Sequence, residues 1–456
     1  MSSLLSAVKY IIGLGANVFL PIVMFGIGLL FGLKPGKALR AALLLGVAFT
    51  AISVFISQLL VGQIAPAAQA MITNTGLKLT ALDVGWPAAS TISWAWPYAA
   101  AMFPLQIFLN LFLLWIGFTK TLNVDLWNVW QKVFAGAVVY GITGSLFMAF
   151  LVATLMIIIE LKLGDLTAKQ AQEISGIPGI SIPHACSTWL LVAAPFEYLL
   201  EKIPGLKKIK ADPKTIQKKI GFFGENIVIG LVMGLLIGIL ARYSFAKILA
   251  LGITTATVMV VLPRVVSIFM EALMPISEAA GDFMKSKFPG REIYIGLDWP
   301  ILAGHPTTIT SAILLIPVLV LLSVVLPGNT TLPFGDLGNF GCLMASVVLL
   351  TNGDMIRSLI IGTIVLAVSL WGASAVAVSF TALAVKSGVV MPENVTQITW
   401  LKTSPIIWFI VEVVKKNIVV VGILFVLAVI SFYLLWKYFA KDTKKAVTEQ
   451  AVTKSI

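Results

Sequence analysis

The sequence predicts an all-α membrane protein with about 11 transmembrane helices, at roughly 20 residues per crossing. Three observations predict this class: an apolar composition, an internal repeat and the positions of the basic residues. Of the 456 residues, 59% are hydrophobic and 11% are charged, and the mean hydropathy is +1.00. A soluble domain carries about 25% charged residues. Apolar stretches recur along almost the whole chain, which leaves no room for a large soluble catalytic domain.

The same composition excludes several other classes. The net charge of +12 does not indicate nucleic-acid binding, because the Lys and Arg residues lie mostly in short connections between apolar runs, as in cytoplasmic loops. Cys186 and Cys342 have no metal-ligand spacing, and His184 and His305 cannot build a zinc site alone. We therefore expect neither a metal nor another cofactor. No phosphate-binding loop motif is present, so ATP does not drive transport from within this chain.

The second half of the chain repeats the first. Six short matches occur in the same order, and their shifts stay between 209 and 213 residues. Each match alone is weak in so apolar a sequence, but two of them include Trp, which is rare. The matches begin at Gly15 and Gly224, Val23 and Val232, Lys37 and Lys247, Trp86 and Trp299, Asp125 and Asp336, and Thr188 and Thr399.

This repeat predicts the domain organisation. The first repeat occupies 1–205, a basic cytoplasmic joint 206–220, and the second repeat 221–415. A last transmembrane helix (416–436) and a basic cytoplasmic tail (437–456) follow. An odd number of spans per repeat would insert the second repeat upside down, the plan of many transporters. The first repeat contains five apolar runs, which we expect to be spans, at 12–32, 41–62, 97–118, 133–159 and 186–200.

The basic residues predict the orientation in the membrane. Seven lysines between 202 and 219 and five between 437 and 454 would be cytoplasmic by the positive-inside rule. An N-terminus outside and a C-terminus inside satisfy both groups. Lys9 and the pair Lys415-Lys416 would then lie outside, against the rule.

The expected substrate site lies at two matched helix breaks. Asp83 precedes the Trp86-Pro87 step, and Asp298 precedes Trp299-Pro300. Proline disfavours helix in the residue before it, and a broken helix at membrane depth survives only when it is buried in protein or lines a wet cavity. We therefore expect re-entrant hairpins here, with Asp83, Trp86 and Asp298 near substrate. The alternative is an ordinary helix entry at the membrane surface, with interfacial Trp.

Three further polar residues belong to the expected site. His184 and His305, the only histidines, flank segments rich in Gly and Pro, and Asp336 lies between Gly335 and a Leu. Ionisable residues in apolar surroundings are site candidates by default, and a neutral imidazole offers one donor and one acceptor to a hydroxyl-rich solute. The alternative for each histidine is a packing role. Asp125, the repeat partner of Asp336, lies near lysines and fits a solvated loop better.

At these motifs the sequence resembles the galactitol-type membrane component, enzyme IIC, of the bacterial sugar phosphotransferase system. The resemblance implies membership of the ascorbate-galactitol superfamily, a homodimer with eleven spans per subunit, and a mobile core that carries substrate across the inner membrane by an elevator-like motion. It covers nearly the whole chain. The motifs are Asp83 to Pro87, Asn123 to Trp130, Ile182 to His184, Glu201 to Gly205, Ile295 to His305, and Leu332 to Leu337.

The resemblance also implies a mechanism and partners. A sugar alcohol would enter from outside and be phosphorylated at the cytoplasmic side by a phosphocysteine on a separate IIB protein, with IIA as the further partner. Neither Cys186 nor Cys342 would be that cysteine, because both lie in apolar segments. The acids and histidines of the expected site would bind hydroxyls. Asp298 or His184 would assist deprotonation of the attacking oxygen.

Two questions stay open at this point. The residues after Trp86-Pro87 and His184 and the bulky Trp299 depart from the galactitol pattern, so a pentitol is an alternative to galactitol. The rival function is a secondary transporter that moves an unmodified solute, coupled to protons or sodium through Asp298, Asp336 or Glu225.

Overall fold

The computed structural model describes residues 16–54, 58–59, 63, 66–67, 70, 74, 79–94, 96–123, 128–206, 226–287, 292–333, 336, 341–386 and 397–453. It is mostly helical, as the composition predicts. Residues 207–220 of the expected basic joint, and Asp125 and Glu225, lie outside these ranges.

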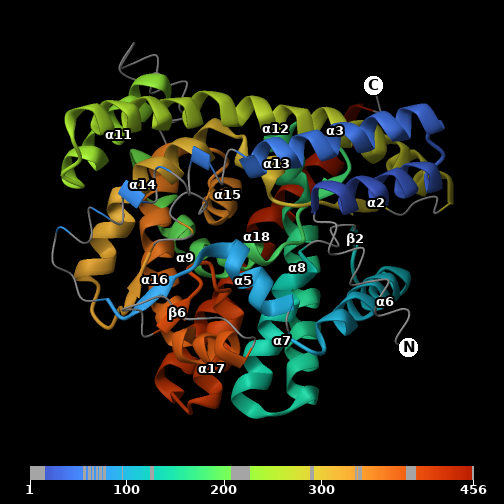
Figure 1. Cartoon of the computed structure of the whole chain (residues 1–456). Coiled ribbons are helices and arrows are strands. Elements are labelled where there is room, and N and C mark those ends of the chain that lie inside the picture. The colour runs from blue at the N-terminus through green and yellow to red at the C-terminus, as the bar shows by residue number, and fades with distance from the viewer. Residues whose placement is uncertain are drawn as a thin grey trace.

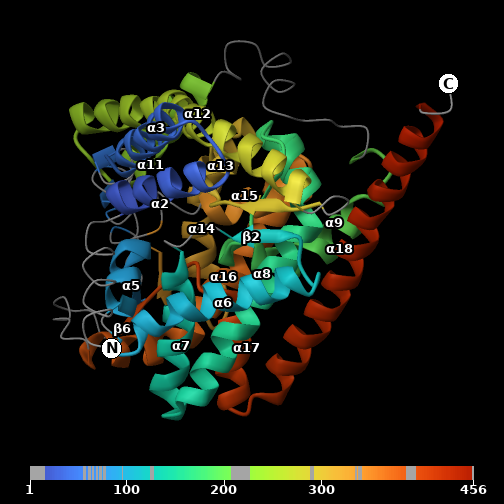
Figure 2. The same cartoon turned by 90° about the vertical axis from the view of Figure 1, so that its right-hand side faces the viewer.

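Four helices form a layer across one end of the molecule (Figures 1 and 2). Glycines allow α11 and α12 to pack closely in this layer. A Cβ atom at Gly234 would lie 2.5 Å from the carbonyl oxygen of Leu251, so only Gly fits there. Small residues at helix contacts are typical of membrane proteins, because close backbone approach increases van der Waals contact. The layer comprises α2 (Ala16–Leu30), α3 (Pro35–Val54), α11 (Asn226–Leu240) and α12 (Phe245–Lys287).

The remaining helices form the body beneath this layer (Figure 1). Within the described residues, four helices are long and apolar enough to cross a membrane, and several apolar helices are shorter. The four are α8 (Leu146–Ser175), α14 (Pro306–Val325), α16 (Met355–Lys386) and α18 (Ile418–Thr453), and α18 continues past the expected end of the last span at 436. The shorter helices of the body include α6 (Met102–Trp115), α7 (Val129–Thr143) and α9 (Leu190–Leu200).

One expected span is two helices. The apolar run 133–159 was expected as one crossing, but α7 ends at Thr143 and α8 begins at Leu146. Gly144 adopts φ +66°, in the left-handed region that Gly tolerates best, and the Ser145 side chain accepts the backbone N–H of Met148 as an N-cap. The expectation of one helix is therefore wrong, because hydropathy alone does not register a tight turn between two apolar helices.

The expectation of an all-α chain also needs correction, because in the part of the chain that the structure describes six short strands form two parallel sheets. Each sheet has a central strand from one half of the chain between two strands from the other half. In the first sheet β1 (Ala81–Asp83) lies between β5 (Thr331–Leu332) and β6 (Gln397–Thr399). In the second, β4 (Tyr294–Gly296) lies between β2 (Thr121–Asn123) and β3 (Ile180–Ser181).

Short helices follow these strands and begin close to the expected breaks. Gly85 starts α5 (Gly85–Trp94) directly after β1, so Pro87 lies in its first turn. Pro300 is the first residue of α13 (Pro300–Ala303), a position where the missing N–H costs nothing. The two Trp-Pro steps are therefore strand-to-helix junctions. The other short helices are the 3₁₀ helix η3 (Ala185–Trp189), α15 (Gly341–Leu350) and α17 (Pro405–Val414).

Candidate functional site

Asp83, the last residue of β1, joins three separate segments. Its side chain is fully buried, and its Oδ2 accepts the backbone N–H of Asp336 at 2.8 Å. Its Oδ1 accepts the backbone N–H groups of Leu401 at 2.9 Å and Gly85 at 3.2 Å. Hydrogen bonds to a charged acceptor are stronger than neutral ones. Asp83 therefore fixes the start of α5, the turn at Asp336 and the end of the β6 segment relative to one another.

Asp336 is equally buried and collects donors from the same segments. Its Oδ2 accepts the indole N–H of Trp400 at 2.8 Å, and its Oδ1 accepts the backbone N–H of Trp86 at 3.2 Å. The ammonium of Lys402 lies 3.3 Å from the same Oδ1. We call Asp83, Asp336, Trp400 and Lys402 the aspartate cluster.

Trp400 and Lys402 were not among the residues expected from the sequence. Trp400 packs against Trp130 and Phe134, with ring centroids 4.8 Å and 5.2 Å apart, which holds its indole N–H toward Asp336. Lys402 is 5% exposed, so its charge is neutralised inside the protein and not by water. A Lys so close to an apolar run is itself a site signal, and it would have identified Lys402.

A second cluster surrounds His184, which precedes η3. Its Nδ1 accepts the backbone N–H of Cys186 at 3.0 Å, which places the ring proton on Nε2 in the neutral form. Nε2 lies 3.4 Å from Oδ1 of Asp298 and 3.1 Å from the side-chain amide of Gln131. His184 is 1% exposed, whereas the Asp298 side chain is 16% exposed. We call His184, Asp298 and Gln131 the histidine cluster.

The amide of Gln131 is best placed with its oxygen toward His184. A Gln131 nitrogen facing Nε2 would set two donors against each other and leave the buried Gln131 oxygen without a hydrogen-bond partner within the described residues. Exchanging the two amide atoms lets Oε1 accept the Nε2–H proton, and such amide orientations follow from the hydrogen-bond network. Gln131, which sequence reasoning did not identify, then holds the tautomer that carries the proton on Nε2, the nitrogen that lies beside Asp298.

The two clusters adjoin through η3 and the segment after β6. The hydroxyls of Thr188 and Ser404 lie 3.0 Å apart, two residues after Cys186 and Lys402 respectively. The Sγ atoms of Cys186 and Cys342 lie 2.6 Å apart, and both thiols are buried. Residues from both halves of the chain therefore form one continuous polar interior.

A buried ion pair lies directly beside the histidine cluster. Lys132 of α7 forms an ion pair with Glu160 of α8, and each side chain is at most 2% exposed. Lys132 follows Gln131, so this pair fixes the part of α7 that carries the amide. Sequence reasoning missed this pair because Lys132 and Glu160 flank the expected apolar run 133–159. A charged residue at the end of an apolar run is usual for a solvated loop.

His305 lies against a different part of the protein from the aspartate and histidine clusters. Its Nδ1 accepts the backbone N–H of Thr307 at 3.3 Å, which caps the start of α14. Its ring packs on Gly353, where an added Cβ would lie 3.1 Å from Cε1. The Thr307 hydroxyl donates to the Gly353 carbonyl at 2.8 Å. His305 thus joins α14 to the turn between α15 and α16.

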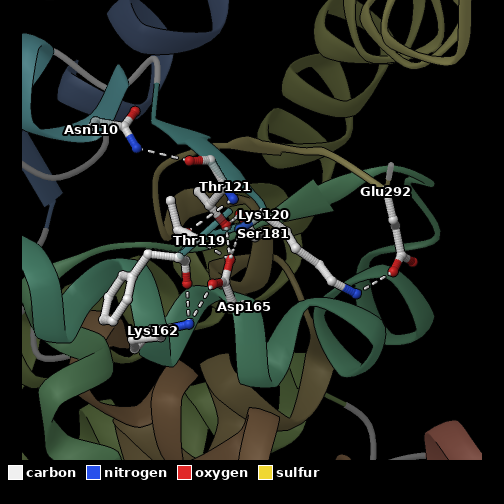
Figure 3. A network of polar contacts seen from close by, with 9 residues as sticks. Asn110, Thr119, Lys120, Thr121, Lys162, Asp165, Ser181 and Glu292 are labelled. Carbon is white, nitrogen blue, oxygen red and sulfur yellow. Dashed lines mark hydrogen bonds and ion pairs between the residues drawn. The ribbon is translucent and has the colours of Figure 1, made fainter. Parts of the chain in front are cut away.

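A network at the second sheet positions the strand that leads to His184 (Figure 3). Asp165 of α8 accepts the hydroxyls of Thr119 and Thr121 at 2.9 Å each and the backbone N–H of Lys120 at 3.0 Å. The Thr121 hydroxyl also lies 2.8 Å from that of Ser181 in β3. Asp165 therefore fixes β2 and β3 to α8. Ser181, the last residue of β3, lies three residues before His184.

The chemistry of this interior suits a ligand rich in hydroxyl groups. It combines carboxylate acceptors, an ammonium, an imidazole and the buried indole N–H of Trp86, which has no hydrogen-bond partner within the described residues. Within the same residues, no group of three His, Cys, Asp or Glu side chains could hold a metal ion. The arrangement can therefore bind and orient a polar solute through hydrogen bonds.

Comparisons with known proteins identify the family. The family model described as PTS system sugar-specific permease component, EIIC-GAT, matches residues 10–394. The chain is 35% identical over 446 residues to the PTS system galactitol-specific EIIC component of Escherichia coli (strain K12), covering 97% of this chain and 99% of that protein. The protein of the same name from Escherichia coli O157:H7 matches equally. A further protein of strain K12, described as a permease IIC component, is 38% identical over 429 residues, 93% of this chain and 98% of its own length. The chain therefore belongs to the EIIC-GAT family, the sugar-specific permease components of the phosphotransferase system, and is an integral membrane protein.

Proposed function

We propose that this permease translocates a sugar alcohol, galactitol or a pentitol, and presents it for phosphorylation at the cytoplasmic side. The observation that carries the proposal is the buried polar interior in which the aspartate and histidine clusters adjoin. Burying the charges of Asp83, Asp336 and Lys402 costs free energy. Ionisable residues inside a membrane protein therefore mark a functional site by default. Galactitol is named in the similar Escherichia coli proteins, and the departures after Trp86-Pro87 and His184 keep a pentitol open.

The residues of the site would share the work of binding. The Trp86 indole is a donor without a partner in the described residues, and the partly exposed carboxylate of Asp298 is an acceptor. In this proposal Trp86 and Asp298 contact different hydroxyl groups of the sugar alcohol. Asp298, beside the Nε2–H of His184, would accept the proton of the attacking hydroxyl, since a base must lie within hydrogen-bond reach of that proton. His305 would act at the periphery, where it joins α14 to the 351–354 turn.

The two sheets support the proposal of inverted repeats. In each sheet, one half contributes the centre and the other half both edges, so the halves exchange roles. Equivalent positions follow from the register: Leu82 with Ile295, Leu122 with Leu332, and Ile180 with Ile398, separations of 213, 210 and 218 residues. The third separation differs from that of the sequence match at Thr188 and Thr399, because Thr399 lies in β6 at the position of Ser181 in β3, whereas Thr188 lies in η3. That sequence match therefore does not pair equivalent positions.

The inverted repeats suggest how the protein lies in the membrane and how it transports its substrate. We propose five spans per repeat plus a last span, with α8 as the span in place of the expected run 133–159. The N-terminus would lie outside and the C-terminus in the cytoplasm, in the inner membrane of a bacterial cell. A homodimer would hold the layer of α2, α3, α11 and α12 while the body moves as an elevator. The thiols of Cys186 and Cys342 are 5% and 2% exposed, so a separate IIB protein, loaded by IIA, would supply the phosphocysteine. The chain's own part would be to align one hydroxyl and exclude water.

Transport coupled to phosphorylation tests the proposal directly. Vesicles containing the permease, with IIA, IIB and phosphoenolpyruvate inside, should convert external galactitol or a pentitol into internal phosphorylated product. Omission of IIB should abolish product formation. Accumulation of unmodified polyol that collapses with a protonophore would instead support the rival, a secondary transporter.

A further inference from the structure

On one side of the molecule α18 lies along α9 and α17 (Figure 2). The residues that line two adjoining cavities show that a groove runs between α18 and the body there. Its deeper part is a cavity of about 290 Å³ with an almost wholly apolar lining. The walls come from α8, α9, α16 and α17 on one side and from α18 on the other. The α18 residues that line it run from Ile423 to Phe432.

The groove opens at one end into a wider cavity of about 460 Å³, whose mostly apolar wall carries polar side chains on one side. We call this the polar end of the groove. The two cavities share Trp371, Trp408, Ile423 and Leu424 in their linings, so they are continuous. The polar side chains in this wall are those of Thr330, Ser374, Glu412 and Asn417.

Charges of both signs gather at this polar end. The Glu412 carboxylate accepts the Asn417 side-chain amide at 2.7 Å and the Trp408 indole N–H at 3.3 Å. The Lys415 ammonium lies 3.7 Å from Glu412, and the exposed Lys416 follows it, held at φ +58° in the turn between α17 and α18. The Glu412 carboxylate and the Lys415 ammonium thus stand together at this end of the apolar slot, and Lys416 is the next residue in the turn.

The length of the groove matches one leaflet of a bilayer. From Asn417 to Phe432 the lining spans sixteen residues of α18 and its start, or about 24 Å at 1.5 Å per residue. Half of the hydrocarbon core is about 15 Å thick, and the headgroup region adds several ångströms on each side. The polar end therefore lies at headgroup depth when the apolar part lies among acyl chains.

We propose that this groove binds one phospholipid with a zwitterionic headgroup of the phosphoethanolamine type. An acyl chain fills the apolar slot, the phosphate contacts Lys415 and Lys416, and the headgroup ammonium contacts Glu412. A purely anionic headgroup would satisfy the lysines but leave the Glu412 carboxylate facing a second negative charge, so the mixed charges favour a zwitterion.

The shape of the groove favours a lipid over a second copy of the chain. Both walls belong to one protomer, so the apolar part is a slot between α17 and α18 and not an open face. Another protein would have to separate these helices to enter. The proposal also explains why Lys415 and Lys416 stand on the outer side in the expected topology, against the positive-inside rule: they serve a lipid phosphate.

Lipid retention tests the proposal. The full-length permease is reconstituted in bilayers with equal amounts of phosphatidylethanolamine, phosphatidylglycerol and phosphatidylcholine, extracted mildly, and weighed by native mass spectrometry. We expect about one phosphatidylethanolamine per chain to persist. Ala428→Trp fills the slot, and Lys416→Glu reverses a charge at the exposed end. Each should lower retention about tenfold, which corresponds to about 1.4 kcal/mol. Val426→Trp, on an exposed α18 position that does not line the groove, should retain lipid like the wild type.

Each other outcome overturns the proposal. Equal retention by the wild type and both groove variants would show that no lipid binds there. Preferential retention of phosphatidylglycerol would refute the headgroup assignment. A change of oligomeric state in Ala428→Trp without loss of lipid would assign the groove to a second copy, and detergent alone in the groove would leave it an adventitious site. Because Lys416 is exposed, its variant folds independently of whether the slot tolerates Trp.

Discussion

The carboxylate of Asp83 accepts the backbone N–H of Asp336 at 2.8 Å, across 253 residues of sequence. The acid of one half of the chain therefore fixes the acid of the other half, and both are fully buried. This contact, with the Lys402 ammonium 3.3 Å from Asp336, makes the site a product of both halves.

The buried pair of Asp336 and Lys402 should show strong coupling in a double-mutant cycle. Asp336→Asn or Lys402→Met alone leaves an uncompensated charge, which costs about 3–5 kcal/mol in a buried pair. The double variant removes both charges and should be less destabilised than the sum of the two. Thermal unfolding of the purified variants measures this. Additive effects would mean that the two groups do not interact in the membrane.

Two substitutions of His184 should distinguish its structural role from its role in transport. Its Nδ1 caps η3 by accepting the Cys186 N–H at 3.0 Å, and its Nε2 faces Asp298. His184→Ala loses both, and a lost cap costs about 1 kcal/mol. His184→Asn keeps an acceptor near the Nδ1 position. Both should abolish uptake, but only the Ala variant should lower the melting temperature. Uptake by either variant at the wild-type rate would remove His184 from the site.

Asp298→Asn should abolish phosphorylating uptake and leave the protein folded. The side chain is partly exposed, so the substitution removes a charge without opening a cavity. The Trp299 N–H, which donates to Oδ1 at 2.7 Å, can still donate to the amide oxygen of Asn. Uptake assays with size-exclusion chromatography of the same preparation check this, and Lys207→Ala, in the expected joint, is the control with unchanged affinity for substrate.

The turn between α7 and α8 depends on Gly144. Gly144→Ala places a Cβ at φ +66° and should destabilise the protein by about 1–2 kcal/mol. The matched control is Gly141→Ala, three residues earlier within α7. No atom lies within 4 Å of the added Cβ at either position, so only the backbone conformation differs. Gly141→Ala should stabilise the helix by up to about 1 kcal/mol. Equal changes in the melting temperature of Gly144→Ala and Gly141→Ala would contradict the left-handed backbone conformation at Gly144.

The ion pair between Lys120 and Glu292 should make a small contribution to stability that depends on pH. Partial burial raises the pKa of Glu292, but hydrogen bonds from Lys120 and Tyr294 outweigh it and bring the pKa below the ordinary value of 4.5. A carboxyl group whose pKa falls on folding stabilises the protein above its unfolded pKa and loses this effect as the pH falls through its folded pKa. Because both side chains are more than half exposed, we expect at most about 0.5 kcal/mol.

Comparing the wild type with Glu292→Gln in thermal unfolding checks this pH dependence. The two melting temperatures should differ slightly at neutral pH and converge as the pH falls through the folded pKa of Glu292, which lies below 4.5, since the carboxyl of the wild type is then protonated. A difference that grows as the pH falls would reverse the sign of the expected effect.

The sequence by itself determined the class and the family, and it singled out residues that the fold brings together. The apolar composition does not depend on which residues contact one another, so the sequence alone predicts a membrane protein. The family prediction is confirmed by the family model and the relatives. Five of the six expected residues, Asp83, Trp86, Asp336, His184 and Asp298, lie in or against the two adjoining clusters. They were found because ionisable or aromatic residues beside Pro or Gly are rare in apolar surroundings.

Only the tertiary structure decided how these residues meet and which others join them. Strands of two or three residues leave no alternating pattern, so the two sheets could not be foreseen. Gln131 looks ordinary in its own segment, and His305 looks like His184. The segment of Lys402 shows a charge beside an apolar run but not the partner of that charge. The roles of these residues follow from partners more than fifty residues away, such as Gln131 for His184 and Asp336 for Lys402. Local sequence records the cost of burying a charge, but the partner that offsets this cost is fixed only when the chain folds.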